Sequence, residues 1–535
     1  MKTLTKIACG SLAGDASPDG TIARFKGIPY AKPPVGALRW RPPQRPAPWS
    51  GTRPAVQFGP ASIQLLSPKY SFWYMDEDTM SEDCLYLNVY TGSLDPAERR
   101  PVIVWLHFGA FNFGWSGSSL FDGTELARKG AVVVTVNYRL GRIGFLAHRA
   151  LSAESEFHAS GNYGLMDQIA ALTWIRENIG AFGGDPGCVT VYGVSAGSFS
   201  VSALMASPLA KGLFHRAIGG SGGAFGPVSE DTSRIGDYTQ SLEAAERAGE
   251  ALMAGFGATT AEAMRALPVE PMLTVDLSQP GPGFFDSAYP LIDGHILPVD
   301  PYRAFTSGQY NDVPLITGST ANEIGPFFAE TEKYLEVSRT LIGDSFDRFI
   351  ALFPAGPDGR TMISSTAGNG DRLFTWQNWT WARLQARHGR NPVYYYHFAH
   401  PSPVPHNRYL EQSLFPNLGA VHTSEVPYVF RNLAARSWPW SPTDHQLSDT
   451  MSAYWIEFAR SGSPNGDDRP RWPRFVERDG QMMSFEGSPV ARSAPSEHLR
   501  ERLSFWDDFF AEERRRQETR AGRLEVGRDG GPSMP

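Results

Sequence analysis

Short runs of apolar and β-branched residues alternate along the chain with stretches of helical character. The five clearest predicted strands are residues 102–107, 132–136, 189–192, 313–317 and 393–397. Their hydrophobicity is almost uninterrupted, which indicates strands buried on both faces of a sheet. Between the second and third runs, residues 165–179 place apolar side chains at helical spacing. The pattern predicts an α/β fold with a strand–helix–strand unit over 132–192 and a mostly parallel central sheet flanked by helices.

The number of domains does not follow from length, because 535 residues would by length alone predict three or four domains of ~150 residues. No Gly/Ser-rich or Pro-rich linker and no internal repeat divides the chain. We therefore expect one large domain over residues 1–510, with helical insertions around 229–300 and 330–390. Residues 511–535 contain a dense run of charges and end in Gly and Pro, and we predict a flexible, solvated tail there.

The N-terminal residues 1–20 carry two lysines and only scattered apolar residues. We expect them to supply the first strand of the fold and not a secretory signal, and no run approaches the ~18 apolar residues of a membrane span. The three cysteines, Cys9, Cys84 and Cys188, are too few and too scattered for a disulfide framework. These features predict a cytoplasmic protein.

The charge balance limits the possible partners. Lys and Arg total 49 against 56 for Asp and Glu, a formal net charge of −7, so there is no basic excess to neutralise phosphates. We expect a small-molecule partner and no nucleic acid. No H-x-x-x-H or C-x-x-C pattern is present, and we expect no metal and no organic cofactor. The oligomeric state, monomer or homo-oligomer, stays undetermined.

A G-x-S-x-G pentapeptide at residues 193–197 follows directly on the predicted strand 189–192 and precedes a stretch that can continue as a helix. A sharp strand-to-helix turn holds a serine in a strained, exposed position, and small neighbours keep the backbone from clashing. The pentapeptide alone is a weak motif in a chain with 54 glycines. Its position between strand and helix makes Ser195 the candidate nucleophile.

A serine hydroxyl needs a base, and the base needs a group that orients it. In this topology the order along the chain is Ser, acid, His. Glu323 lies just beyond the strand 313–317, at the carboxyl end where catalytic groups of open α/β sheets collect, although a loop Glu is most often simply solvated. Position alone does not choose the base, for which the candidates are His397, His400, His406 and His422. His422 follows a Pro-rich, irregular stretch, as a catalytic histidine on a loop would.

Acyl transfer develops negative charge on the carbonyl oxygen, which fixed backbone N–H groups must stabilise. Residues 107–111, His-Phe-Gly-Ala-Phe, follow the strand 102–107 and are similar to the His-Gly-Gly-Gly loop of esterases and lipases. The expected oxyanion donors are the N–H groups of Gly109, Ala110 and Ala196. The alternative for this loop is an ordinary glycine turn.

With these motifs in place, the sequence resembles the type-B carboxylesterase family from residue 5 to residue 506. The matching pieces, in chain order, are residues 25–36, 81–88, 107–111, 137–139, 161–168, 182–186, 193–197, 213–218, 318–323 and 421–422. The resemblance implies an α/β-hydrolase fold and a triad of Ser195, Glu323 and His422.

The resemblance also implies supporting residues. The family places a serine near the histidine and acid, which Ser221 matches, and a buried acid close to the triad, which Glu425 matches. The sequence also matches two structural ion pairs of the family, Arg39 with Glu82 and Arg139 with Asp167.

Four departures from the family pattern are informative. Phe108 replaces the first loop glycine, and we expect its ring close to the acyl pocket, where it would change acyl selectivity. Val194 and Tyr74 stand where cholinesterases have Glu and Trp, so choline esters are not supported. Cys84 matches a cysteine that secreted members bridge to one upstream, but no cysteine lies between Cys9 and Cys84. We expect that bridge to be absent.

The predicted function is ester hydrolysis in two steps through an acyl-enzyme on Ser195. We expect this reaction to require no cofactor. Aromatic residues make up 12% of the chain, which favours hydrophobic or aromatic esters. A possible gorge lining, although such residues more often form plain core, comprises Phe225, Phe284, Phe285, Trp376, Trp379 and Trp381. The alternatives are an amide or carbamate hydrolase or a lipase with the same triad, and a non-catalytic adhesion-type homologue.

Overall fold

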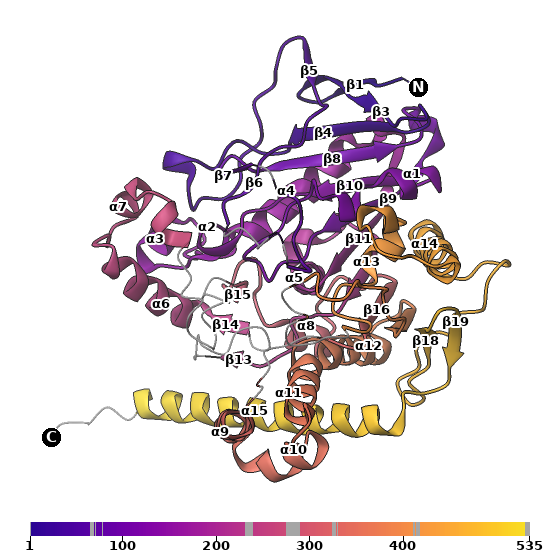
Figure 1. Cartoon of the computed structure of the whole chain (residues 1–535). Coiled ribbons are helices and arrows are strands. Elements are labelled where there is room, and N and C mark those ends of the chain that lie inside the picture. The colour runs from indigo at the N-terminus through magenta and orange to yellow at the C-terminus, as the bar shows by residue number, and fades with distance from the viewer. Residues whose placement is uncertain are drawn as a thin grey trace.

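The computed structural model describes residues 2–64, 69, 71–77, 79–229, 239–273, 289–323, 328, 330–409, 412 and 418–529, with the backbone alone for 271, 272 and 520–529. Within this part of the chain, eleven strands form one central sheet (Figure 1). Their order across the sheet is β19 (Pro489–Arg492), β18 (Met482–Phe485), β17 (Val393–Phe398), β16 (Leu315–Thr320), β12 (Arg216–Gly220), β11 (Gly184–Val194), β9 (Arg100–Leu106), β10 (Val132–Val136), β8 (Tyr86–Thr91), β4 (Ala23–Pro29) and β3 (Asp15–Ala16).

The centre of the sheet is parallel and its margins are antiparallel. Every neighbouring pair from β18 to β10 is parallel, whereas β19, β8, β4 and β3 are attached antiparallel. The five predicted strands are confirmed as β9, β10, β11, β16 and β17. Strand β16 begins two residues later than predicted, after Pro314, which has no N–H to donate to a ladder. The predicted α/β fold with a mostly parallel sheet is confirmed.

The predicted strand–helix–strand unit is present, but its two strands are not neighbours. Helix α4 (Tyr163–Asn178) connects β10 to β11, and β9 lies between these two strands, pairing with both. The N-terminal residues 1–20 contain the first strand, as predicted, and two more strands, of which β3 is the edge of the central sheet. Strands β1 (Leu4–Ile7) and β2 (Gly10–Ala13) form a hairpin that belongs to a separate three-stranded sheet with β5 (Thr52–Pro54).

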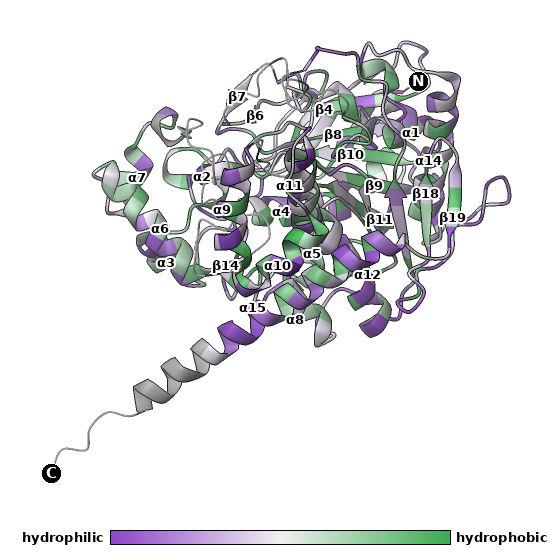
Figure 2. Cartoon of the chain, turned by 60° about the horizontal axis from the view of Figure 1, so that its bottom comes forward, coloured by the Kyte–Doolittle hydropathy of each residue, from purple (hydrophilic) through white to green (hydrophobic). Residues whose placement is uncertain are grey.

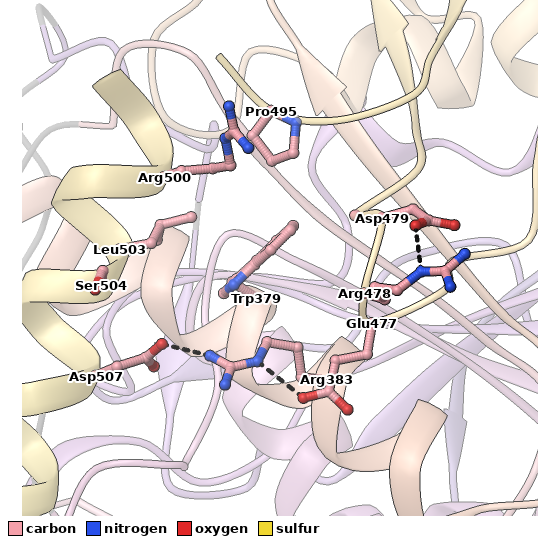
Figure 3. Close-up of a pocket in the computed structure, with 11 residues that line it drawn as sticks. Trp379, Arg383, Glu477, Arg478, Asp479, Pro495, Arg500, Leu503, Ser504 and Asp507 are labelled. Carbon is pink, nitrogen blue, oxygen red and sulfur yellow. Dashed lines mark hydrogen bonds and ion pairs between the residues drawn. The ribbon is translucent and has the colours of Figure 1, made fainter. Parts of the chain in front are cut away.

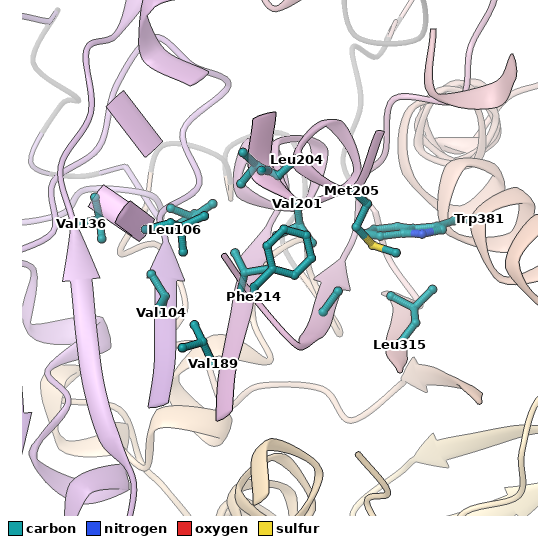
Figure 4. Packing of buried hydrophobic residues seen from close by; sticks show 14 of the residues in the cluster. Val104, Leu106, Val136, Val189, Val201, Leu204, Met205, Phe214, Leu315 and Trp381 are labelled. Carbon is teal, nitrogen blue, oxygen red and sulfur yellow. The ribbon is translucent and has the colours of Figure 1, made fainter. Parts of the chain in front are cut away.

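Alternate residues of the central strands enter two different cores, as the two-residue period of a strand requires. On β9, Val102, Val104 and Leu106 belong to one hydrophobic cluster, whereas Ile103 and Trp105 belong to another. The first cluster lies under helices α4, α5 (Ala196–Ala206) and α12 (Trp376–His388), and Figure 4 shows part of it around Val201, Leu204 and Met205. The second packs against α13 (Val426–Phe430) and α14 (Pro442–Ser461).

Further short elements lie around the sheet. The helices are α1 (Thr124–Arg128), α2 (Gly141–Phe145), α3 (Arg149–Glu154), α6 (Leu242–Gly255), α7 (Ala261–Ala266), α8 (Pro301–Thr306), α9 (Thr331–Ile342), α10 (Phe346–Leu352), α11 (Arg360–Gly370) and α15 (Glu497–Asp529). Two short sheets are formed by β6 (Ala61–Ser62) with β7 (Met80–Ser81), and by β13 (Val228–Ser229), β14 (Thr239–Ser241) and β15 (Leu291–Ile292). Helices therefore occur in both regions predicted as insertions, while the single-domain boundary at 1–510 stays a prediction.

In the C-terminal segment, α15 continues as helix through residue 511 to Asp529, while the flexibility of the predicted tail stays a prediction. The charged run is a helix surface on which Glu512 pairs with Arg515 and with Arg516, three and four residues further along. The guanidinium of Arg514 lies 3.6 Å from the ring centroid of Tyr302 in α8. Figure 2 shows this hydrophilic part of α15 in purple, leaving the body of the molecule. Among the helices of the described chain, none has the length and hydropathy to span a membrane.

One ion pair is fully enclosed by the fold. Arg139, after β10, donates from Nε and Nη2 to the two carboxylate oxygens of Asp167 in α4, each at 2.8 Å, and both side chains are 0% exposed. The second predicted pair, Arg39 with Glu82, is also present, with Nε 2.6 Å from Oε1. Both pairs hold distant segments together.

We expect Arg139→Met to lower the free energy of unfolding by about 3–5 kcal/mol, because it leaves the buried Asp167 carboxylate without a charged partner. Denaturant unfolding measures this loss. The matched control is Arg24→Met, since the Arg24–Asp15 pair is partly exposed, with side chains 20% and 33% accessible. That control should cost about 1 kcal/mol or less. Equal losses for the two variants would contradict the structural role of the buried pair.

Candidate active site

The turn between β11 and α5 has the geometry of a nucleophile elbow. Ser195 has φ 57° and ψ −124°, a conformation that a non-glycine residue adopts only under constraint. A Cβ at Gly193 would lie 2.2 Å from the carbonyl carbon of Gly197, and one at Gly197 would lie 2.1 Å from the carbonyl oxygen of Leu106. Both positions therefore require glycine. The Ser195 N–H donates to the Gly220 carbonyl at 2.9 Å, and its side chain is partly exposed.

Glu323 and His422 form a buried acid–base pair. Nδ1 of His422 lies 2.5 Å from Oε2 of Glu323, and the other carboxylate oxygen accepts the Thr320 N–H at 2.8 Å. The residues just before them, Asn322 and Val421, form a parallel bridge, which aligns the two loops. With a proton on Nδ1 held by the carboxylate, Nε2 is the nitrogen left to act as a base.

The other candidate histidines have different surroundings. His400 lies 2.9 Å from Asp444, whose carboxylate also accepts the Tyr428 hydroxyl at 2.7 Å. His397 is inside strand β17, where it pairs with Ser319 and Ser484 in register. Of the four histidines, only His422 is hydrogen-bonded to Glu323 in the described part of the chain. The geometry favours His422 as the partner.

The strand register brings the nucleophile and the acid–base pair to one edge of the sheet. Val194 is level with Gly220, and Gly220 is level with Gly318, so β11 and β12 end together and β16 ends two residues further on, at Thr320. Ser195, Ser221 and the Glu323 loop leave from these carboxyl ends, where ligands of parallel sheets bind. The Ser195 hydroxyl has no hydrogen-bond partner among the described residues. The structure thus joins His422 to Glu323 and, within the described chain, leaves the Ser195 hydroxyl on the same edge without a hydrogen bond.

The loop after β9 has the conformation of an anion-binding turn. Gly109, Ala110 and Phe111 have φ of 125°, 52° and 60°. The Gly109 carbonyl accepts the N–H groups of Asn112 and Phe113 at 2.9 and 3.0 Å, and none of the described residues accepts from the N–H of Gly109, Ala110 or Ala196. Consecutive unpaired N–H groups in such a turn form a concave anion site. Gly197 lies against Leu106 and His107, so the elbow and this loop are neighbours.

His107 fixes the conformation of this loop through its contacts. Its Nδ1 lies 2.9 Å from the Phe108 carbonyl, its ring stacks on Tyr138 at 4.5 Å, and burial lowers its pKa to about 4. The imidazole is therefore neutral at physiological pH. The Tyr138 hydroxyl donates to the His107 carbonyl at 2.9 Å, which fixes the loop from a second side.

Phe108, whose side chain the sequence places close to the acyl pocket, is buried in the core. Its side chain is 3% exposed and packs edge-on against Phe121, with ring centroids 5.9 Å apart, inside the second core cluster. Strict alternation would place Phe108 on the side of Leu106, but β9 ends at Leu106, and beyond its end Phe108 joins Ile103 and Trp105 in the second cluster. Its described contacts give no support to a direct effect on acyl selectivity, which stays a prediction.

Ser221 and Glu425 are both buried near the carboxyl ends of the strands. Ser221 is 0% exposed with φ 50°, and its hydroxyl has no partner among the described residues. Glu425 is 0% exposed and accepts the Tyr396 hydroxyl at 3.2 Å. Burial and then the negative charge of Glu323 raise the pKa of Glu425 to about 8. Glu425 is therefore a neutral carboxylic acid at pH 7.

This raised pKa predicts a pH-dependent stability. The folded protein keeps the Glu425 proton that the unfolded chain releases near the ordinary carboxyl pKa of 4.5, so this contribution is full below that value and is lost as the pH rises through about 8. We expect Glu425→Gln, which cannot ionise, to lose less stability than the wild type between pH 6 and pH 9. Denaturant unfolding across this range measures it, and parallel curves for the two proteins would contradict the assignment.

Two aromatic residues beside His422 were missed in the sequence. The ring of Phe374 lies 4.1 Å from the imidazole, and the Trp73 indole N–H donates to the His422 carbonyl at 3.4 Å. Neither contact has a local signal, because each joins segments distant along the chain.

The aromatic residues proposed as a gorge lining are mostly core. Phe225, Trp376 and Trp381 are 0–1% exposed, and Phe284 and Phe285 lie outside the described residues. Trp379 lines a different cavity of about 500 Å³ between α12, α15 and the 477–480 loop (Figure 3). There Arg383 is paired with both Glu477 and Asp507. None of Ser195, Glu323 and His422 lines this cavity.

Comparisons with known proteins agree with this geometry. The Carboxylesterase family matches residues 2–350 and 362–506. Cocaine esterase of Homo sapiens is 33% identical over 94% of this chain and 90% of its own, and para-nitrobenzyl esterase of Bacillus subtilis (strain 168) is 34% identical over 90% and 95%. The crystal structure of a Geobacillus stearothermophilus carboxylesterase superposes with a TM-score of 0.78 at 32% identity, covering 94% of this chain and all of that one. The chain therefore belongs to the carboxylesterase family and is a carboxylic ester hydrolase.

Proposed function

We propose that this esterase works through an acyl-enzyme on Ser195, with His422 as general base and Glu323 as the group that orients it. The observation that carries the proposal is the 2.5 Å contact between Nδ1 of His422 and Oε2 of Glu323, on the sheet edge from which the Ser195 elbow projects. A base fixed by a buried carboxylate, on the same sheet edge as a partly exposed and strained serine, is the arrangement that nucleophilic acyl transfer needs.

The reaction would proceed in two steps, acylation of Ser195 and hydrolysis of the acyl-enzyme. Nε2 of His422 takes the Ser195 proton as Oγ forms a bond to the ester carbonyl carbon, and the protonated imidazole then gives that proton to the departing alcohol. Water next attacks the acyl-enzyme, again losing a proton to His422. Collapse returns the proton to Ser195 Oγ and releases the carboxylic acid. Glu323 stays ionised throughout and stabilises the imidazolium.

We propose the N–H groups of Gly109, Ala110 and Ala196 as donors to the oxyanion in both steps. Their support is the pair of positive φ angles at Gly109 and Ala110, together with the contact of Gly197 with the end of β9. Backbone donors fixed before the charge develops need no reorganisation during the reaction.

We expect Gly109→Ala to lower kcat about 10²- to 10³-fold, the effect of losing one oxyanion donor. A Cβ at this position would lie 1.8 Å from the Phe113 carbonyl oxygen, so the loop must move. Steady-state kinetics on a soluble ester measures the loss. The matched control is Gly130→Ala, a glycine with φ 96° and nothing within 4 Å of its Cβ position, which should keep its kcat. Full activity in Gly109→Ala would exclude this loop as the oxyanion site.

We propose hydrophobic or aromatic esters as the substrate class. Phe374 and Trp73 next to His422 support this, as does the similarity to proteins named for cocaine and para-nitrobenzyl esters. A panel of short-chain, long-chain and aromatic esters with matched anilides tests it, and we expect the highest kcat/KM for the aromatic esters. Faster cleavage of anilides would favour the amidase alternative, and activation by substrate droplets would favour a lipase.

We also propose a cytoplasmic location. The free thiols of Cys9, Cys84 and Cys188 support it, because free cysteines persist in a reducing compartment. Cell fractionation with an antibody to the protein tests this proposal, and recovery in the extracytoplasmic fraction would contradict it.

A further inference from the structure

A π-helical turn at Asp371–Thr375 separates α11 from α12 and lies against the proposed triad. Such turns are rare and occur often at functional sites, because they change which side chains face a given neighbour. At its start, a Cβ at Gly370 would lie 2.6 Å from the Glu323 carbonyl oxygen, so only glycine allows this approach. After it, Asn378 accepts the Gly222 N–H at 2.6 Å and donates to the Gly219 carbonyl at 3.0 Å. One segment therefore contacts the backbone of the acid and the backbone next to Ser221.

Within this turn, Phe374 faces the imidazole of His422. The ring centroids are 4.1 Å apart and the planes are inclined by 32°. Phe374 is partly exposed, whereas the other residues of the turn are buried. The hydrogen bond to Glu323 fixes Nδ1 but leaves the imidazole free to rock about that contact. An aromatic face against the ring restricts this motion, and it attracts the imidazolium that forms when Ser195 loses its proton.

An ion pair with the C-terminal helix holds the turn in place. Nε and Nη2 of Arg502 in α15 each lie 2.6 Å from one carboxylate oxygen of Asp371. The Asp371 side chain is 3% exposed and that of Arg502 is 20% exposed. A buried carboxylate in a bidentate pair cannot move away from its partner without a large cost. The pair therefore fixes the first residue of the turn that carries Phe374.

We propose that Phe374 is a positioning residue for His422, held against the imidazole by the π-helical turn and the Asp371–Arg502 pair. The inference rests on the proposed roles of Ser195, Glu323 and His422. The Phe374 ring would then contribute to the proton transfers that every substrate requires. Its role would not be limited to contacting one kind of acyl group.

The test compares Phe374→Leu with Phe374→Tyr. We expect the leucine variant to lower kcat about 3- to 10-fold, the range of a lost aromatic contact, with little change in KM. The loss should be equal for esters with different acyl groups, because the imidazole acts on all of them. The tyrosine variant keeps the ring face and should keep kcat.

A spectroscopic readout reports the imidazole directly. The proton shared by His422 and Glu323 lies in a short hydrogen bond, so it should give a strongly downfield ¹H resonance. We expect this resonance to broaden or shift in Phe374→Leu and to be retained in Phe374→Tyr. The matched control is Phe475→Leu, a 5% exposed phenylalanine that contacts Trp379 and Tyr395 but no residue of the triad. It should lose stability without losing kcat or the resonance.

Three results would overturn the inference. These are unchanged kcat and an unchanged resonance in folded Phe374→Leu, a loss confined to one acyl group or to KM, and an equal loss of kcat in Phe475→Leu. If Phe374→Leu does not fold, the double variant Asp371→Asn with Arg502→Gln replaces it, and full kcat there would count against the inference. Labelling of wild-type Ser195 by a phosphonylating probe separates a failure of the proposed function from a failure of the role assigned to Phe374. Label on another serine refutes the proposed function, whereas label on Ser195 with a fully active leucine variant refutes only the role of Phe374.

Discussion

Replacing Ser195 by alanine is expected to lower the rate of ester hydrolysis by roughly 10⁴- to 10⁶-fold without unfolding the protein. The hydroxyl forms the covalent bond to the acyl group, and no other group can replace it in that step. The partly exposed side chain and the unpaired hydroxyl mean that alanine removes no contact on which the fold depends. Steady-state kinetics, with circular dichroism to check folding, measures this outcome.

Ser198→Ala is the matched control for this experiment. Ser198 lies one helical turn further along α5, is fully buried, and donates to the Gly222 carbonyl at 2.6 Å. Its removal should cost stability through a lost buried hydrogen bond, about 1–3 kcal/mol, and reduce kcat by less than ~10-fold. Substantial hydrolysis by Ser195→Ala, or an equal loss in both variants, would contradict the role of Ser195 as nucleophile.

Glu323→Gln is expected to lower kcat by roughly 10³- to 10⁴-fold, the second largest effect. The substitution keeps the shape of the side chain but removes the charge that stabilises the imidazolium of His422. The amide also allows the tautomer with its proton on Nε2, which cannot accept the Ser195 proton. Pre-steady-state kinetics on an aryl ester should show slow acylation and slow deacylation, because His422 acts in both steps.

Glu425→Gln provides the matched comparison, since it makes the same chemical change in a second buried acid near the triad. Glu425 already carries a proton at neutral pH, with its pKa raised to about 8, so the amide replaces one neutral group by another. We expect less than a ~10-fold loss of kcat at pH 7. Similar losses for the two variants would contradict the assignment of Glu323 as the triad acid.

The elements of the sheet could be predicted from local pattern, but their order could not. The β-branched runs that became β9, β10 and β11 are visible in the sequence because burial on both faces demands continuous hydrophobicity. That β9 lies between the other two is decided by contacts between distant segments. The helical conformation of the charged run at 512–516 could not be predicted, because i,i+3 and i,i+4 pairing on a helix surface has the same composition as a solvated end.

Some residues of the candidate site could likewise be predicted from local sequence, whereas others depend on contacts between distant segments. Ser195 has a local signal, since the glycines at 193 and 197 are required by the elbow itself. His422 could not be selected by position and needed either the resemblance or the contact with Glu323. Phe374 has no signal at all, because a π-helical turn leaves no mark in the helical periodicity of residues 360–388. The position of the Phe108 ring has no local signal either, because it is set by packing against Phe121.

The most direct test of the central claim is to treat the protein with an active-site phosphonylating probe and map the labelled peptide by mass spectrometry. The account predicts one label per chain, on Ser195, with ester hydrolysis lost in proportion to the labelled fraction. A label on any other serine, or retained hydrolysis in fully labelled protein, would contradict it.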